Sequence, residues 1–103
     1  MTSTWGTLLL LVACMHGAHA DEPPLPADVQ RYLRAAGQCR HFAGEWDSAL
    51  KKSDRRRIEK NIDRYCGSAQ RQLNTLTAKY KHRQSVRTIL SEHQYDSVTA
   101  YRR

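Results

Sequence analysis

The residues of this chain that could do chemistry are most concentrated in one segment, Cys39 to Asp47, which reads CRHFAGEWD. His41 and Glu45 lie four residues apart in it. On a continuous helix they would share one face and could act as an acid–base pair or as two metal ligands. Gly44 stands between them and predicts that the helix stops there, so we expect structural roles for this segment.

In that structural interpretation the segment is a helix end beside a disulfide. Phe42 and Trp46 are expected to fill the corner next to the bridge. Gly44 is expected to take the left-handed backbone that often ends a helix. Asp47 is expected to cap the helix after it, because its carboxylate can accept a hydrogen bond from a free backbone N–H group.

The sequence does not favour other catalytic or metal-binding arrangements. His82 and His93 are the only histidines after residue 20 besides His41, and a zinc site needs three or four ligands in a compact arrangement. The chain has no Gly-x-Ser-x-Gly motif for a nucleophilic serine and no glycine-rich phosphate loop. We therefore expect no cofactor, no metal site and no enzymatic activity.

The N-terminal residues are typical of an export signal. An apolar run from Leu8 to Ala13 is followed by Ala18-His19-Ala20, a small-x-small triplet of the kind that signal peptidase cleaves. We expect residues 1–20 to be a signal peptide and the mature chain to begin at Asp21, in the periplasm or secreted. The apolar run is far shorter than the roughly 20 residues that a membrane-spanning helix needs.

A second processing route uses Cys14. The residues Leu11 to Cys14 have the form of a lipobox, in which the cysteine is lipidated and becomes the new N-terminus. The alternative to a soluble exported protein is therefore an outer-membrane lipoprotein anchored at Cys14.

Either route leaves Cys39 and Cys66 as the pair of cysteines in an oxidising compartment. We expect a disulfide between them. By the loop-closure entropy, a bridge of this span stabilises the fold by about 3 to 4 kcal/mol. A single domain of little more than 80 residues has limited apolar burial, so such a bridge matters to its stability.

The charge of the chain favours an anionic partner. It has 17 Lys and Arg residues against 10 Asp and Glu residues, a net charge of +7, and all of them come after residue 20. An acidic protein or an anionic envelope component would be attracted by this field, whereas nucleic acid is not favoured without base-stacking aromatics or a recognised motif. The expected contacts recur every fourth residue on one helix: Lys52, Arg56, Lys60 and Arg64. The alternative is an ordinary solvated helix face.

The spacing of the apolar residues predicts an all-α protein. Helices are expected over residues 26–44, over 48–66 with Gly67 ending the helix, over 68–81, and from a cap at Ser85 to about residue 95. Helices this short cannot bury their apolar faces alone, so we expect a small antiparallel bundle of three to four short helices stapled by one disulfide. Residues 21–25 would form an extended lead-in, 26–96 the helical domain and 97–103 a C-terminal tail.

The chain resembles a family of short exported proteobacterial proteins. The family shares a Cys-x-His-Phe-x-Gly-Glu segment, a second cysteine 25 to 30 residues later and a Lys/Arg-Tyr segment beyond it. The residues that match are Cys39, His41, Phe42, Gly44, Glu45, Cys66, Lys79 and Tyr80. The resemblance covers most of the chain after residue 20 and implies a fold type and an export route, but no catalytic residues.

Taken together, these features predict an exported, non-catalytic binding or accessory protein of the cell envelope, with an anionic partner on its basic second helix. A small inhibitor of an envelope-directed enzyme is one alternative. A metal-dependent enzyme that uses His41 and Glu45 is another.

Overall fold

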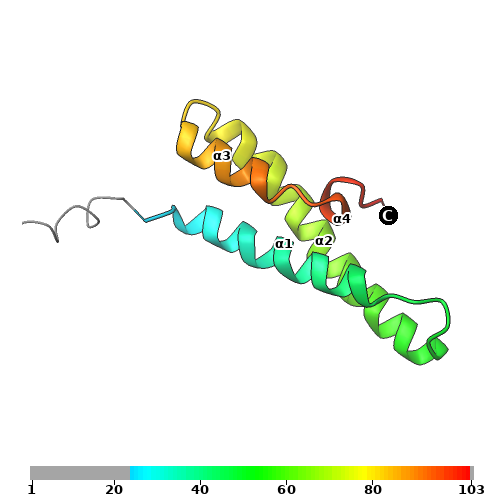
Figure 1. The fold of residues 1–103 in the computed structure, drawn as a ribbon. Coiled ribbons are helices and arrows are strands. Elements are labelled where there is room, and N and C mark those ends of the chain that lie inside the picture. The colour runs from blue at the N-terminus through cyan, green and yellow to red at the C-terminus, as the bar shows by residue number, and fades with distance from the viewer. Residues whose placement is uncertain (1–23, 103) are drawn as a thin grey trace, which may run out of the picture.

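A computed structural model describes residues 24–102 of the chain. The expected signal peptide, Cys14 and most of the expected lead-in lie outside the described residues. Within them the chain forms four helices and no strand: α1 (Ala27–Glu45), α2 (Lys52–Lys79), α3 (Gln84–Glu92) and α4 (Asp96–Thr99). Figure 1 shows α1 and α2 as an antiparallel hairpin. Helix α3 runs back along the second half of α2, and α4 follows α3 shortly before the C-terminus. The predicted all-α bundle is confirmed.

Helix α1 begins after Pro26, whose carbonyl accepts hydrogen bonds from the backbone N–H groups of Val29 and Gln30 at 3.1 and 3.0 Å. Proline suits this position because its fixed φ matches the start of a helix. The buried side chains of α1 recur at steps of three and four residues, which turns one face of the helix into the core: Val29, Tyr32, Ala36 and Cys39.

Helix α2 is one continuous helix of 28 residues, and the expected break at Gly67 does not occur. Gly67 is buried, and a Cβ atom added there would lie 3.4 Å from the ring of Tyr101. Gly67 therefore does not end the helix. Because it has no side chain, the ring of Tyr101 can lie close to the helix backbone at this position. The expected helices 48–66 and 68–81 are halves of one element, and Cys66 lies in its interior.

The connection between α1 and α2 also differs from the expectation. Asp47 does not cap a helix that starts at Ser48. Instead its side-chain Oδ1 accepts a hydrogen bond from the backbone N–H of Ala49 at 2.9 Å, and its carbonyl accepts one from Leu50 at 3.1 Å. Asp47 thus stabilises a turn, as aspartate often does, and α2 begins only at Lys52.

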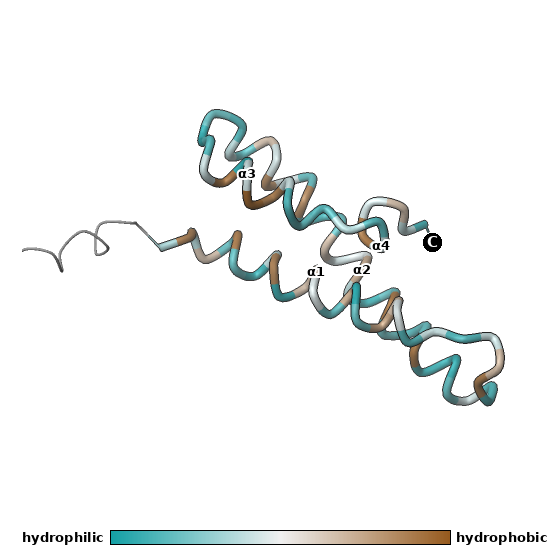
Figure 2. Tube along the Cα trace, viewed as in Figure 1, coloured by the Kyte–Doolittle hydropathy of each residue, from teal (hydrophilic) through white to brown (hydrophobic). Residues whose placement is uncertain are grey.

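Helix α3 starts two residues earlier than expected. Ser85 lies inside the helix, and Arg83 precedes the first helical residue without a side-chain capping bond. Val86 and Leu90, four residues apart on one face of α3, are buried. Figure 2 shows hydrophobic stretches recurring between hydrophilic ones along α1, α2 and α3, as the helical spacing of the apolar residues requires.

The C-terminal residues are packed against the helices. Val98 is fully buried in α4. The side-chain Nε2 of Gln70 on α2 donates hydrogen bonds to the carbonyl oxygens of Val98 and Tyr101 at 3.0 and 3.1 Å. The expected boundary between the helical domain and a tail, after residue 96, falls inside α4, so residues 97–102 belong to the packed structure.

The disulfide joins the second half of α1 to the middle of α2. Cys39 of α1 and Cys66 of α2 are both fully buried and form the bridge, with 4.6 Å between their Cα atoms. The expected pairing is confirmed. A disulfide of this kind indicates a location outside the cytoplasm, where thiols are not kept reduced.

Candidate functional site

The first half of α2 presents a row of cationic side chains, which we call the basic row: Lys52, Arg56, Lys60 and Arg64. All four residues are exposed, and successive members are about 6 Å apart along the axis because four residues advance an α-helix by that much. The buried residues Ile58 and Cys66 lie on another side of the same helix. The helix therefore faces the core with one side and presents the basic row to solvent.

The carboxylates near the basic row are engaged elsewhere. Asp54 forms an ion pair with Arg57 at 3.6 Å. Glu59 accepts a hydrogen bond from the indole Nε1 of Trp46 at 3.0 Å, and Asp63 accepts one from the hydroxyl of Tyr101 at 2.7 Å. These contacts hold the three acids to partners outside the basic row.

The cations of the basic row are correspondingly unpaired. Within residues 24–102, none of the four forms an ion pair. Arg64 contacts an aromatic ring instead, with its guanidinium carbon 5.2 Å from the ring centre of Tyr65. Exposed cations that form no ion pair remain available to an external anion.

His41 and Glu45 are brought together, contrary to the expectation that Gly44 would end the helix between them. α1 continues through Gly44 to Glu45, and the His41 Nε2 atom lies 3.4 Å from the Glu45 Oε2 atom. A Cβ atom added at Gly44 would meet no atom of the described residues within 4 Å. Both side chains are largely exposed, at 57% and 46%, and the pair lies in open solvent.

A metal ion would need more ligands than this pair supplies. Within residues 24–102, no group of three or more His, Cys, Asp or Glu side chains is placed to hold a metal ion. His93 makes structural contacts: its Nδ1 atom lies 2.9 Å from the carbonyl of Ile89, and its ring packs edge-on against Tyr95. His82 is exposed.

The aromatic corner beside the disulfide is only partly as expected. Phe42 is half-buried and stacks on Tyr65 of α2, with 5.7 Å between the ring centres. Trp46 does not fill the corner. It comes directly after the end of α1, is 42% exposed, and is held by its hydrogen bond to Glu59.

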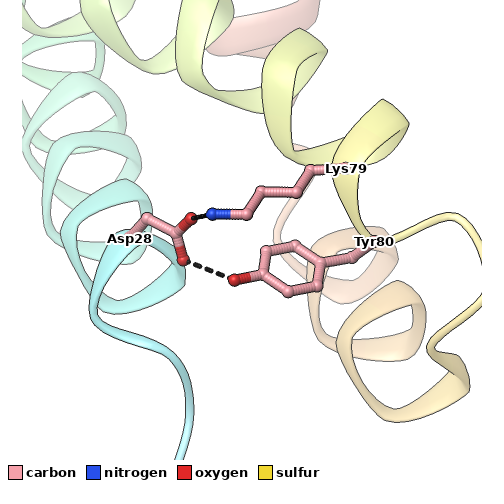
Figure 3. A network of polar contacts seen from close by, with 3 residues as sticks. All are labelled: Asp28, Lys79 and Tyr80. Carbon is pink, nitrogen blue, oxygen red and sulfur yellow. Dashed lines mark hydrogen bonds and ion pairs between the residues drawn. The ribbon is translucent and has the colours of Figure 1, made fainter.

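One polar network in the structure was not singled out from the sequence as a site. Asp28, near the start of α1, accepts hydrogen bonds from the Lys79 Nζ atom at 2.7 Å and from the Tyr80 hydroxyl at 3.0 Å (Figure 3). The only signal for it was the Lys79-Tyr80 pair in the family pattern, because Asp28 is separated from Lys79 by 51 residues.

This network changes the ionisation of its members. The hydrogen bond from Lys79 holds the pKa of Asp28 below its usual value of 3.8, since it favours the charged carboxylate. The same hydrogen bond raises the pKa of Lys79 above 10.5. The network ties the N-terminal end of α1 to the C-terminal end of α2, at the opposite end of the hairpin from the basic row.

Two further findings bear on function. No helix within residues 24–102 has both the length and the apolar content to cross a membrane. Comparisons of the chain with models of known protein families, with curated proteins and with solved structures find no match.

Proposed function

We propose that this protein is an exported, non-catalytic binding or accessory protein of the cell envelope that engages an anionic partner through the basic row. The observation that carries the proposal is the row of exposed cations on α2 that form no ion pair within residues 24–102. The four residues of the basic row have no ion-pair partner in the described part of the chain, and Asp54, Glu59 and Asp63 contact residues outside the row.

The arrangement supports recognition of a surface or an extended polyanion. From Lys52 to Arg64 the basic row spans about 18 Å along a rigid helix. The disulfide at Cys66 fixes this helix to α1, so little ordering is needed when a partner binds. Charges on such a row act over a screening length of about 8 Å at physiological ionic strength.

The test compares two variants that remove the same charge. The first changes Lys52, Arg56 and Lys60 to Gln, and the control changes Lys81, Arg83 and Arg87 to Gln. All six residues are exposed, so both variants should fold. Binding to immobilised lipopolysaccharide and to an immobilised acidic polysaccharide is measured at low and high salt.

We expect the unmodified protein to bind at least one of these surfaces, to lose affinity steeply with salt, and to lose much more affinity in the first variant than in the control. Binding that responds equally to both variants would mean that only net charge matters. Binding that ignores salt would contradict an electrostatic contact.

Export itself is part of the proposal. The Ala18-His19-Ala20 triplet supports cleavage before Asp21, and the disulfide supports a compartment that permits oxidation. The intact mass of the exported protein should match a chain beginning at Asp21. A mass that includes an acylated Cys14 would establish the lipoprotein instead.

One observation bears on the metal-dependent alternative. The continuous helix places His41 and Glu45 at 3.4 Å, which supplies two ligands. Catalytic zinc sites use three protein ligands. The pair lacks a third among the described residues, so we propose the binding role rather than this one. Metal analysis of the purified oxidised protein checks that choice, since stoichiometric zinc would favour the enzyme.

A further inference from the structure

A small surface pocket lies between the first half of α1 and the second half of α2. Its volume is about 250 Å³, below the roughly 300–1,000 Å³ that is usual for pockets holding drug-sized ligands. Asp28 and Arg31 line it from α1, and Arg71, Thr75, Leu76 and Lys79 line it from α2. The pocket shares no residue with the basic row, so a ligand bound in it would be independent of the anionic partner proposed for that row.

The charges in this pocket do not balance. The carboxylate of Asp28 has both oxygens engaged, one by Lys79 at 2.7 Å and the other by Tyr80 at 3.0 Å, as Figure 3 shows. Asp28 and Lys79 therefore cancel each other. Arg31 and Arg71 are exposed and form no ion pair with any residue from 24 to 102. Two positive charges, one from each helix, are left over in a single pocket.

The uncharged residues that line the pocket indicate which other groups the ligand carries. Leu76 is only 3% exposed and gives the pocket an apolar wall. Thr75 is exposed beside it and carries a hydroxyl that can donate or accept a hydrogen bond. A ligand that matches the pocket therefore combines a compact dianionic group with a small apolar part.

We propose that this pocket binds a phosphate monoester, with Arg31 and Arg71 contacting the phosphate from opposite helices and Leu76 contacting the organic part. Guanidinium groups suit phosphate because their planar N–H groups can donate two parallel hydrogen bonds. A phosphate monoester carries close to two negative charges at neutral pH, since its second proton dissociates near a pKa of about 6. That charge matches the two unpaired arginines.

The experiment measures binding of phenyl phosphate and of inorganic phosphate to the oxidised protein by titration calorimetry. We expect saturable binding of phenyl phosphate, tighter than that of inorganic phosphate because of the apolar wall, and weaker below about pH 6 as the phosphate gains a proton. Arg31→Gln and Arg71→Gln should each weaken binding by about tenfold or more, since each removes hydrogen bonds to a charged group.

Arg34→Gln is the matched control. Arg34 is exposed on α1 and does not line the pocket, and its substitution removes the same single charge. Retention of the helical circular-dichroism signal shows that each variant is folded. The proposal is overturned if the unmodified protein shows no saturable binding, or if Arg34→Gln weakens binding as much as the two pocket variants do. The triple change of Lys52, Arg56 and Lys60 to Gln should leave phenyl phosphate binding intact, and its loss there would place the site on the basic row.

Discussion

The ring of Tyr101 lies against the backbone of Gly67, where an added Cβ atom would sit 3.4 Å from the ring. The hydroxyl of the same tyrosine donates a hydrogen bond to Asp63, one turn earlier on α2, at 2.7 Å. Tyr101 thus packs on α2 at the one glycine of that helix. This contact joins the C-terminal segment to the middle of α2.

The effect of a Gly67 substitution on the stability of the protein should depend on the size of the new side chain. Gly67→Ala adds a methyl group at ordinary contact distance from Tyr101, and it should stabilise the protein by up to about 1 kcal/mol, because alanine favours a helix more than glycine does. Gly67→Leu must displace the ring and should destabilise by about 1 to 3 kcal/mol. Urea unfolding measures both. Equal stability of the two variants would show that the ring does not pack there.

Loss of the disulfide should destabilise the fold strongly. The bridge spans a sequence separation of 27 residues, and its removal should cost about 3 to 4 kcal/mol through the entropy of the open unfolded chain. Thermal unfolding of the oxidised protein is compared with that of the Cys39→Ser, Cys66→Ser double variant. Titration of the native protein should find no free thiol among these two cysteines. Two reactive thiols, together with unchanged melting after reduction, would contradict the bridge.

Tyr32 should ionise at unusually high pH. Burial raises the pKa of its hydroxyl to about 12, and the hydroxyl donates a hydrogen bond to the carbonyl of His93 at 2.7 Å. Because the folded pKa exceeds the unfolded value of 10.0, this contribution to stability is complete below pH 10 and is lost as the pH rises toward 12. Tyr32→Phe should remove one phenolate step from the absorbance titration.

The same Tyr32→Phe change should cost about 0.5 to 1.5 kcal/mol, the net worth of one hydrogen bond. Tyr95→Phe is the control, since Tyr95 is half-buried and its hydroxyl donates no hydrogen bond within residues 24–102. If the absorbance step near pH 12 persists in Tyr32→Phe, that step belongs to another tyrosine.

The Asp28 network should make stability sensitive to acid. The pKa of Asp28 is lowered in the folded protein, so its contribution is present above the unfolded value of 3.8 and is lost as the pH falls through the lower folded value. Asp28→Asn should remove that part of the pH dependence and free the end of α1 from Lys79. Hydrogen exchange of the first turns of α1 measures the second effect.

Glu92→Gln serves as the control for Asp28→Asn, because Glu92 is exposed and forms no ion pair within the described residues. It should leave both the acid limb of the stability curve and the exchange of α1 unchanged. A curve for Asp28→Asn that matches the unmodified protein at every pH would contradict the network.

Much of the fold could be predicted from the sequence. The inward positions of Val29 and Ala36 on α1, of Leu73 on α2 and of Leu90 on α3 result from apolar spacing, because a period of 3.6 residues places the apolar residues of each helix on one side of it. The Cys39–Cys66 pairing could be predicted by counting cysteines in an oxidising compartment. The exposure of the basic row could also be predicted, since charged residues away from the apolar face of an amphipathic helix remain in solvent.

Helix boundaries at glycines could not be predicted in this way. Gly44 and Gly67 were both expected to end helices, and both lie within them. The cost of glycine in a helix, about 1 kcal/mol, is a local preference. It is small beside the packing of a whole helix against a core, so the tertiary contacts decide the outcome. One result is the His41–Glu45 pair, which exists only because α1 continues through Gly44.

The sequence by itself determined the helical class, the core positions, the disulfide and the exposure of the cationic row, since each depends on spacing or composition along the chain. Only the tertiary structure decided that Tyr101 packs on Gly67, that Lys79 and Tyr80 hold Asp28, and that Arg31 and Arg71 line one pocket. These pairs of residues are 34 to 52 positions apart, and no local periodicity specifies them, because they depend on where the chain turns between its helices.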